Sequence, residues 1–496
     1  MATYEDVINL ALRRSFFYPS SDIYANAPAG FYSYGPYGTA IRRALIEQWR
    51  RLLLERTNML EIDSAITMPE DVFKSSGHLA SFADPITECV KCESTYRADQ
   101  LLTDHTEKEY KEAQSDEELT AALVENKLKC GKCGGALGPV KRSSLMVKAD
   151  VGVAKKTNCY LRPETCQGIF CDFAKLYKTM RVKLPQGIAQ VGKAFRNEIS
   201  PRQTLLRQVE FYQMEAEVFF NPREINDVSE FDAVRDTKLN IQLADQDKPK
   251  IMTAGELVEK KIVSGTLVAH YLALTQQLMA SYGLALEHCR FRQLDEDERA
   301  FYAKEGWDFE VQSSVGWLEL IANNYRTDYD LKGHQEGSGT DLTVLDEETN
   351  NKYIPHVWEI SIGLDRTFYA VLEHAYNKDD KRMWLSLPAV LAPRKVAVFP
   401  LLSNKPPLVE KAKEVQKVLL GLNPVLDTRG SIGKRYARSD EIGIPVCVTI
   451  DFDTLEDETV TVRERDTTEQ KRVPIQELWK VLEDVLVRAK RLSTLQ

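Results

Sequence analysis

The sequence predicts an α+β domain on a mainly antiparallel sheet flanked by helices, a C-terminal α/β domain and a small cysteine-bearing insertion. Three observations support this prediction. Three segments between residues 209 and 361 alternate with the period of two that strands have, and each places a glutamate among apolar neighbours. From about residue 389 onward, apolar strands alternate with helical segments. Two Cys-x-x-Cys pairs precede all of these segments.

Length and composition bound the possible functions. The 496 residues exceed what one hydrophobic core usually supports, so we expect two or three domains. No apolar run reaches the roughly 18 residues that cross a membrane, and the first twenty residues lack a secretory pattern. We therefore expect a cytoplasmic protein without a membrane partner. The net charge of −9 argues against non-specific coating of nucleic acid, and we expect no DNA partner.

The first clear element is an amphipathic helix over residues 36–54. Ile41, Leu45, Trp49 and Leu52 recur at helical spacing, with charged residues between them. A β-rich run follows and ends at Pro69, which cannot donate a hydrogen bond to a sheet. The alternative is a generic helix-to-strand unit without a special role.

The two cysteine pairs have the spacing of a structural zinc site with four thiolates. They are Cys89, Cys92, Cys130 and Cys133. The gap of residues 93–129 exceeds the usual spacing, and residues 98–129 are rich in charge, which predicts an exposed insertion. The alternatives are a redox pair or four unrelated thiols.

Arginines gather just ahead of the first alternating segment. Arg196, Arg202 and Arg207 lie on a predicted strand-loop-strand with Asn197 and Glu198. The planar guanidinium group of arginine suits phosphate oxygens, so this segment is a candidate phosphate site. The alternative is an exposed hairpin with ordinary surface arginines.

The first alternating segment, residues 209–220, has one apolar and one mixed face. The apolar face carries Tyr212, Met214, Ala216, Val218 and Phe220. The other face carries Phe211, Gln213, Glu215 and Glu217. Taken alone, such a strand is most simply one half-exposed strand of an antiparallel sheet.

Two further strands repeat the pattern. In residues 357–361, Val357, Glu359 and Ser361 oppose Trp358 and Ile360. In residues 316–322, Trp317, Glu319 and Ile321 oppose Leu318 and Leu320. If these faces share one sheet, the clustered carboxylates need a cation, so we expect a substrate ammonium group or Mg²⁺ beside them.

A last candidate residue, Arg366, follows Gly363 near the start of a predicted amphipathic helix. A cation there is poorly placed for the helix dipole, which favours contact with a ligand anion or an aromatic ring. The polar stretch of residues 221–310 gives no chemical signal, and we expect an insertion of unassigned role there.

Together these segments resemble the class II aminoacyl-tRNA synthetases, and specifically the dimeric glycyl-tRNA synthetases. FRNE at 195–198 with the following EFYQMEAE strand is similar to the second motif of that family, and GLDR at 363–366 to its third. RRSFFYPSSDIY, GFYSYGPYG, RPETCQGIF and SDEIGIPVCVTIDFDT are similar to glycyl-type segments, and the resemblance covers nearly the whole chain.

The resemblance implies roles for the candidate residues. ATP would bind Arg196, Asn197, Glu198, Arg207, Gln208, Phe211, Glu319, Leu320 and Arg366. Glycine would bind Glu164, Glu215, Glu359 and Ser361. Arg196 and Arg366 would be catalytic, Glu319 would hold Mg²⁺ with ATP, and the zinc would be structural. The partners would be glycine, ATP, a glycine tRNA and a second copy of the chain.

The expected domain order follows from these assignments. Residues 1–88 and 141–220 would carry the first two motifs of the catalytic domain, with the zinc-binding insertion at 89–140 between them. Residues 221–310 would be the unassigned insertion, 311–388 the core with the third motif, and 389–496 an anticodon-binding domain. Arg429, Lys434, Arg435, Arg438, Arg463 and Arg465 would give the last domain a basic character.

Two alternatives stay open at this level. A catalytically dead relative could use the same dimeric scaffold to bind nucleic acid, although the retained arginines and glutamates argue against it. Within the enzyme class, a prolyl, threonyl or histidyl specificity is the nearest rival.

Overall fold

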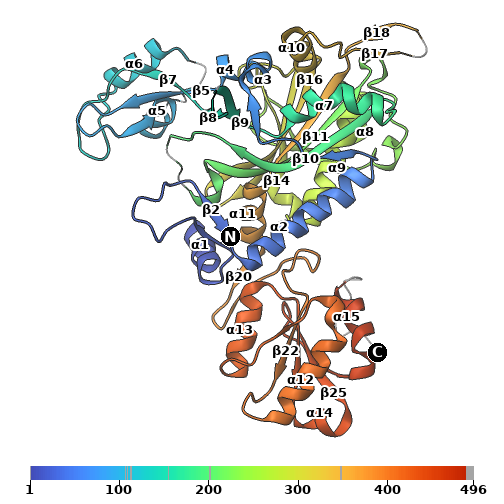
Figure 1. Ribbon diagram of the computed structural model, residues 1–496. Coiled ribbons are helices and arrows are strands. Elements are labelled where there is room, and N and C mark those ends of the chain that lie inside the picture. The colour runs from blue at the N-terminus through green and yellow to red at the C-terminus, as the bar shows by residue number, and fades with distance from the viewer. Residues whose placement is uncertain are drawn as a thin grey trace.

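The computed structural model describes residues 2–106, 108, 110–111, 114–154, 156–199, 201, 203–346 and 349–486, so Arg202 lies outside the described residues. In this part of the chain, nine strands form the central sheet of the larger domain, and the C-terminal domain lies apart from that sheet (Figure 1). In sheet order the strands are β13 (Lys250–Thr253), β12 (Lys238–Gln242), β14 (Cys289–Gln293), β15 (Glu305–Ser313), β16 (Gly316–Thr327), β19 (His356–Gly363), β11 (Glu210–Phe220), β10 (Gln186–Phe195) and β3 (Leu60–Ile62). The β12–β14 and β10–β3 pairs are parallel and the other paired neighbours are antiparallel, as expected.

Helices cover both faces of this sheet (Figure 1). One face packs on α2 (Pro36–Trp49), α9 (Thr266–Ser281) and α11 (Leu364–Ala375). The other packs on α7 (Cys166–Thr179) and α10 (Tyr329–Ser338). Met214, Ala216 and Val218 are buried in the first layer, which confirms the apolar face predicted for β11.

The predicted helix 36–54 is present in two parts. α2 begins at Pro36, where a missing N–H costs nothing, and a π-helical turn, Arg50–Glu55, continues it. Ile41, Leu45 and Trp49 are fully buried against the sheet. The β-rich run after it forms β3 and then β4 (Thr67–Pro69), which pairs with β9 (Thr157–Leu161) and through it with β8 (Val147–Val151).

Residues 221–310, expected as an insertion, are part of the central sheet and its core. They supply β12, β13, β14 and most of β15, and α9 lies in the main hydrophobic core. The periodic signal was weak because α9 is apolar around most of its circumference, with 13 of its 16 residues buried. The segment therefore forms part of the central sheet and of the core that packs beneath it.

The cysteine-bearing insertion has a small core of its own. β5 (Ala83–Glu88), β6 (Thr95–Arg97) and β7 (Lys141–Ser144) form a sheet beside α5 (Ala98–His105) and α6 (Asp116–Glu125). Leu102, Leu119, Leu123 and Val140 are buried between them. The charged composition therefore reflects only the outer faces of two short helices.

The C-terminal domain is the α/β unit that the sequence predicts. Its sheet has the order β23 (Val425–Leu426), β22 (Val396–Pro400), β24 (Val446–Ile450), β25 (Thr459–Glu464) and β26 (Gln470–Pro474). Its helices are α12 (Pro406–Val418), α13 (Ile432–Ile442), α14 (Phe452–Asp457) and α15 (Leu478–Leu486).

Three of the six basic residues expected on this domain are not surface residues. Arg435, Arg463 and Arg465 are buried. Arg463 forms an ion pair with Asp440 at 2.9 Å, and Arg465 donates to the Gly443 carbonyl. Their role is structural, because a buried guanidinium needs such partners.

Shorter elements complete the fold. They are α1 (Tyr4–Arg13), β1 (Phe17–Pro19), β2 (Tyr32–Tyr34), α3 (Glu70–Ser75), α4 (His78–Ser81), α8 (Ala254–Glu259), β17 (Val344–Leu345), β18 (Lys352–Tyr353), β20 (Tyr376–Lys378) and β21 (Met383–Leu385). Among the described residues, no helix combines the length and apolar character needed to cross a bilayer.

Candidate active site

A cavity of about 710 Å³ opens over the acidic face of β11, β16 and β19. One end is lined by Glu164, Glu215, Glu359 and Ser361. The other end is lined by Arg196, Glu198, Arg207, Gln208, Phe211, Glu319, Leu320 and Arg366. The structure thus brings together all but one, Asn197, of the residues assigned to ATP and glycine.

Glu215 is held rigidly at the acidic end. Its two oxygens accept hydrogen bonds from Thr165 Oγ1 at 2.6 Å and Ser361 Oγ at 2.7 Å. Ser361 lies directly opposite Glu215 on the neighbouring strand. Burial raises the pKa of Glu215, and the nearby Glu164 adds to that rise. A cation in the cavity would relieve both effects.

Glu359 is bound to a buried arginine that the sequence did not single out. Arg326 donates to Glu359 Oε1 at 2.7 Å and makes two hydrogen bonds to Asp330, while Asn324 donates to Glu359 Oε2 at 2.7 Å. Burial raises the pKa of Glu359 to about 7 despite this arginine. Tyr302 lines the cavity here, and the centre of its ring lies 3.7 Å from the guanidinium carbon of Arg326.

Glu164 comes from the loop before α7. Its Oε1 lies 3.2 Å from His78 Nε2 and accepts from Cys166 Sγ and Gln167 Nε2. Burial alone would raise the pKa of Glu164, but His78 and Arg326 outweigh burial and hold it well below its usual range. Glu164 is therefore an ionised carboxylate facing the same cavity.

At the basic end, the arginines bind protein groups that a nucleotide could replace. Arg207 Nε donates to Glu198 Oε2 at 2.6 Å, so two residues assigned to ATP contact each other. Arg366 lies 3.3 Å from Glu319. The guanidinium of Arg196 lies 5.3 Å from the centre of the Phe211 ring. These groups suit an anion with an aromatic part.

Asn197 differs from the prediction. Its side chain is exposed and is not among the cavity-lining residues, and its backbone N–H donates to the Leu145 carbonyl at 2.8 Å. The residue thus fixes the loop between β10 and β11 through its backbone.

A bulge explains why Asn324 and Arg326 were missed. Phe309 pairs with Ile321 and Glu310 with Glu319, so Leu320 is an extra residue in β16. Both Leu320 and Ile321 are buried in the main core, contrary to the strict alternation expected from the sequence. Beyond the bulge the cavity-facing positions become even-numbered, and only tracing the strand past Ile321 could have shown this.

Comparisons with known proteins agree with this geometry. Residues 150–252 match the family described as "tRNA synthetase class II core domain (G, H, P, S and T)", and residues 395–485 match "Anticodon binding domain". The chain is 38% identical to the glycine–tRNA ligase of Pyrococcus furiosus over 97% of this chain and 99% of the relative. It is 36% identical to that of Methanocaldococcus jannaschii over 97% and 99%, and to that of Methanothrix thermoacetophila over 98% and 97%.

The chain belongs to the glycine–tRNA ligase family. Two alternatives left open by the sequence thereby lose their support, since these three relatives are all named glycine–tRNA ligase.

This member of the family carries its four patterned cysteines in one cluster. The Sγ atoms of Cys89 and Cys133 lie 3.5 Å apart, as do those of Cys92 and Cys130, and all four lie within 4.8 Å of one another. Four sulfurs at about 2.3 Å from one tetrahedral ion lie roughly 3.8 Å apart. A Cβ on Gly135 would come within 3.0 Å of Cys89 Sγ, so the glycine lets the backbone approach the thiols.

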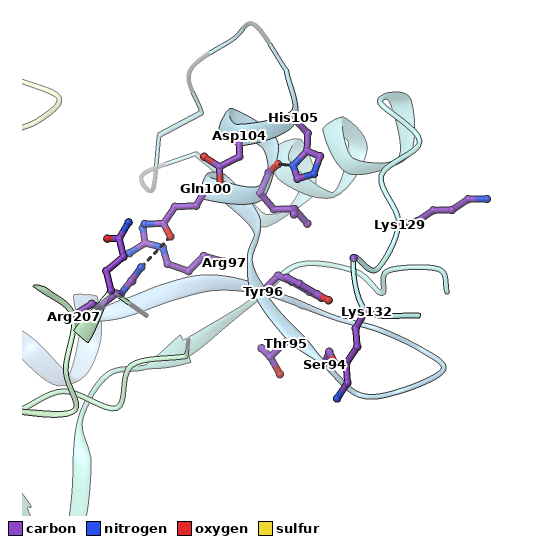
Figure 2. A pocket seen from close by; sticks show the side chains of 13 residues that line it. Ser94, Thr95, Tyr96, Arg97, Gln100, Asp104, His105, Lys129, Lys132 and Arg207 are labelled. Atoms are coloured by element: carbon purple, nitrogen blue, oxygen red, sulfur yellow. Dashed lines mark hydrogen bonds between the residues drawn. The ribbon is translucent and has the colours of Figure 1, made fainter. Parts of the chain in front are cut away.

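A second cavity of about 880 Å³ lies beside this cluster in the glycine–tRNA ligase chain (Figure 2). It shares Arg97, Gln100, Gln203 and Arg207 with the first cavity. Figure 2 shows Tyr96 and Lys132 on one side and His105 across from them. Tyr96 Oη lies 3.1 Å from Cys130 Sγ, which links the cavity wall to the cysteine cluster.

Proposed function

We propose that the protein activates glycine with ATP to glycyl-adenylate and then esterifies glycine to the 3′-terminal adenosine of a glycine tRNA. One observation carries the proposal: three buried carboxylates and a serine hydroxyl converge at one end of a cavity whose other end is lined by arginines. The identity of the chain with glycine–tRNA ligases over nearly its full length supports it.

At the acidic end, Glu164, Glu215 and Glu359 would hold the glycine ammonium group. Their existing hydrogen bonds fix each carboxylate before the substrate arrives, which lowers the cost of ordering the site. A cavity gains nothing from an absent methyl group, so rejection of alanine has to be steric. Tyr302, a bulky side chain that lines the cavity and stacks on Arg326, could supply this steric limit.

At the basic end, the roles follow the family resemblance. Arg196 would contact the α-phosphate, Phe211 and Arg366 would sandwich the adenine, and Glu198 would accept from its amino group. The terminal phosphates would bind Arg207, which would then release Glu198. Gln208 and Leu320 line the same end, whereas the exposed Asn197 has no part in this proposal.

Glu319 would hold Mg²⁺ together with the phosphates of ATP. Its carboxylate lines the cavity beside Arg366 and is only half-buried, which suits a hard cation that keeps its own waters. When bound, Mg²⁺ supplies positive charge to the phosphates.

The chemistry requires no nucleophilic side chain. The glycine carboxylate attacks the α-phosphorus of ATP and pyrophosphate leaves; then the 3′-hydroxyl of the tRNA attacks the glycyl carbonyl and AMP leaves. Arg196 and Arg366 would stabilise the charge that develops on the α-phosphate oxygens. Positioning and charge stabilisation are therefore the work of the protein.

Glycine-dependent exchange of pyrophosphate into ATP tests the proposal. We expect exchange with glycine and none with alanine, proline, threonine or histidine. No exchange with glycine in the presence of Mg²⁺, with and without tRNA, would overturn it. Exchange with one of the other amino acids instead would reassign the specificity.

We propose that the second cavity receives the single-stranded 3′ end of the tRNA. Lys129 and Lys132 offer positive charge, and Tyr96 and His105 offer rings on which bases could stack. Its shared wall with the first cavity supports a path for the terminal adenosine. Lys129→Ala with Lys132→Ala should raise the KM for tRNA and leave glycine-dependent exchange unchanged; equal KM values would contradict this assignment.

We propose that the cysteine cluster binds a structural Zn²⁺ ion, because four thiolates leave no open position for a substrate. Elemental analysis should find about one zinc per chain, and Cys92→Ser should lose it. A protein without zinc would show that the cluster holds only thiols.

We also propose that the protein is a homodimer whose interface includes residues 36–69, as the resemblance implies. Light scattering on the purified protein should give twice the chain mass of 56.4 kDa. A mass equal to one chain would contradict the proposal.

A further inference from the structure

Glu217 is a buried carboxylic acid that the proposed mechanism does not use. It lies on β11, two residues beyond Glu215, and directly opposite Glu359 on β19. Its side chain is fully buried and is not among the cavity-lining residues, and among the residues that the structure describes neither of its oxygens has a hydrogen-bond partner. Glu217 thus lies beside Glu359 on the neighbouring strand, outside the lining of the cavity.

The surroundings of Glu217 are mostly acidic. The titratable and charged groups that face it are Glu215 on its own strand, Glu359 on β19, Arg326 on β16, Asp330 on α10 and Cys166 on α7. Arg326 gives its hydrogen bonds to Asp330 and Glu359, not to Glu217. Ligand atoms of Cys166, Glu217 and Glu359 all lie within 4.8 Å of one another.

We propose that Glu217 carries a proton at neutral pH and thereby favours the ionised form of Glu359, which would receive the ammonium group of the substrate. Two carboxylates this close cannot both be charged without a cation between them. The proton belongs on Glu217, because Glu359 receives two N–H donors that stabilise its charge and Glu217 receives none. Burial, and then repulsion from Glu359, raises the pKa of Glu217 well above its usual range.

This assignment makes Glu217 a positioning residue. Ionisation of Glu217 would push a proton onto Glu359 or draw Arg326 away from it, and either change would weaken the site for an ammonium group. The link to glycine rests on the proposed function, whereas the protonation of Glu217 does not.

Infrared difference spectroscopy tests the proton directly. At pH 7 the wild-type spectrum should contain a C=O stretch of protonated carboxyl groups, and Glu217→Gln should lack the component of that band that Glu217 contributes. Glu210→Gln is a matched control on the same strand, because Glu210 forms an ion pair with Lys193 at the surface. A wild-type spectrum that Glu217→Gln leaves unchanged in this region would overturn the proposal.

Steady-state exchange kinetics test the consequence for glycine. Glu217→Ala should raise the KM for glycine by about tenfold, and Glu217→Gln, an uncharged group of the same shape, should restore it at pH 7. Between pH 7 and 9 the wild-type KM should rise more steeply than that of Glu217→Gln. Thermal unfolding of both variants shows whether each folds.

Three outcomes would count against the inference. Equal KM values for Glu217→Ala and wild type would remove the link to substrate binding. A Gln variant as impaired as the Ala variant would show that a charged Glu217 is needed. A metal ion lost on Glu217→Gln substitution would show that a cation, not a proton, joins Glu217 to Glu359. If the wild-type protein shows no glycine exchange, the proposed function fails while the infrared result still decides the proton.

Discussion

At the scale of single residues, the sequence identified the groups that face the substrates and missed those that hold them. Glu215, Glu359 and Ser361 were found because alternation reveals which side chains share a face. Arg326 was missed because the bulge at Leu320 reverses the alternation of β16 before the strand reaches it. The need for such a partner was predictable from clustered carboxylates, but its identity depends on which strands become neighbours.

Replacing Arg326 should destabilise the protein strongly. Arg326→Lys keeps the charge but cannot span Asp330 and Glu359 with one planar fork, so we expect a loss of about 3 to 5 kcal/mol in unfolding free energy. Urea unfolding gives this quantity. Arg235→Lys is the control, because its pair with Glu259 is exposed and the change should stay within about 0.5 kcal/mol. Similar losses in the two variants would contradict the role of Arg326.

Replacing the arginines at the basic end should act on chemistry instead. Arg196→Ala and Arg366→Ala should each lower the glycine-dependent exchange rate by about a hundredfold or more, because each removes charge that stabilises the reacting phosphate. Affinity for tRNA, measured by filter binding, should change little. Unchanged exchange rates would refute both roles.

At the scale of elements, strands and helices with strong periodicity were predictable and those without it were not. The helix from Pro36 and the strands at 209–220 and 357–361 follow their patterns closely. α9 was not predicted because it is buried on nearly all sides. The bulge in β16 was not predicted because it depends on pairing with β15. Tertiary packing, not local preference, decides both.

α9 also carries an acid-sensitive group. His270 is buried, its Nδ1 has no hydrogen-bond partner in the described part of the chain, and burial lowers its pKa from the usual 6.5 to about 4. Below pH 6.5 the His270 imidazole therefore binds a proton in the unfolded chain but not yet in the folded chain. The free energy of unfolding consequently falls as pH decreases from 6.5 through 4.

We expect His270 to lower the free energy of unfolding by up to about 3 kcal/mol near pH 4, compared with neutral pH. His270→Leu should lose less stability than wild type between pH 6.5 and 4, and should match the wild-type trend above pH 7. Urea midpoints across this range measure the difference. Parallel curves throughout would show that His270 titrates normally.

At the scale of the whole molecule, both domains were predictable because their sequence patterns differ. One has strands that carry glutamates among apolar residues, and the other has apolar strands that alternate with helices. The C-terminal α/β domain was placed correctly in type, but which of its basic residues reach solvent could not be read from charge alone. Arg14 and Arg382 of the larger domain form ion pairs with Glu441 and Asp440, so the two domains are tied at α13.

The exposed basic residues near α13 are the better candidates for tRNA contact. Arg429 and Lys434 are exposed, whereas Arg435, the next residue after Lys434, is buried. Arg429→Ala with Lys434→Ala should raise the KM for tRNA severalfold and leave glycine-dependent exchange at the wild-type rate. Lys417→Ala, on α12, is the control. An unchanged KM for tRNA would place the anticodon contact elsewhere.

The bulge in β16 lets one continuous strand address two different ligands. Before Leu320 the strand turns Glu319 toward the nucleotide end, and after it the opposite phase turns Asn324 and the guanidinium of Arg326 toward the amino-acid end. One extra residue thus changes which alternate side chains of β16 face the cavity between its two halves. Deletion of Leu320 would leave the sequence of the loops and neighbouring strands unchanged. It would, however, turn the cavity-facing side chains in the amino-acid half of β16 into the hydrophobic core.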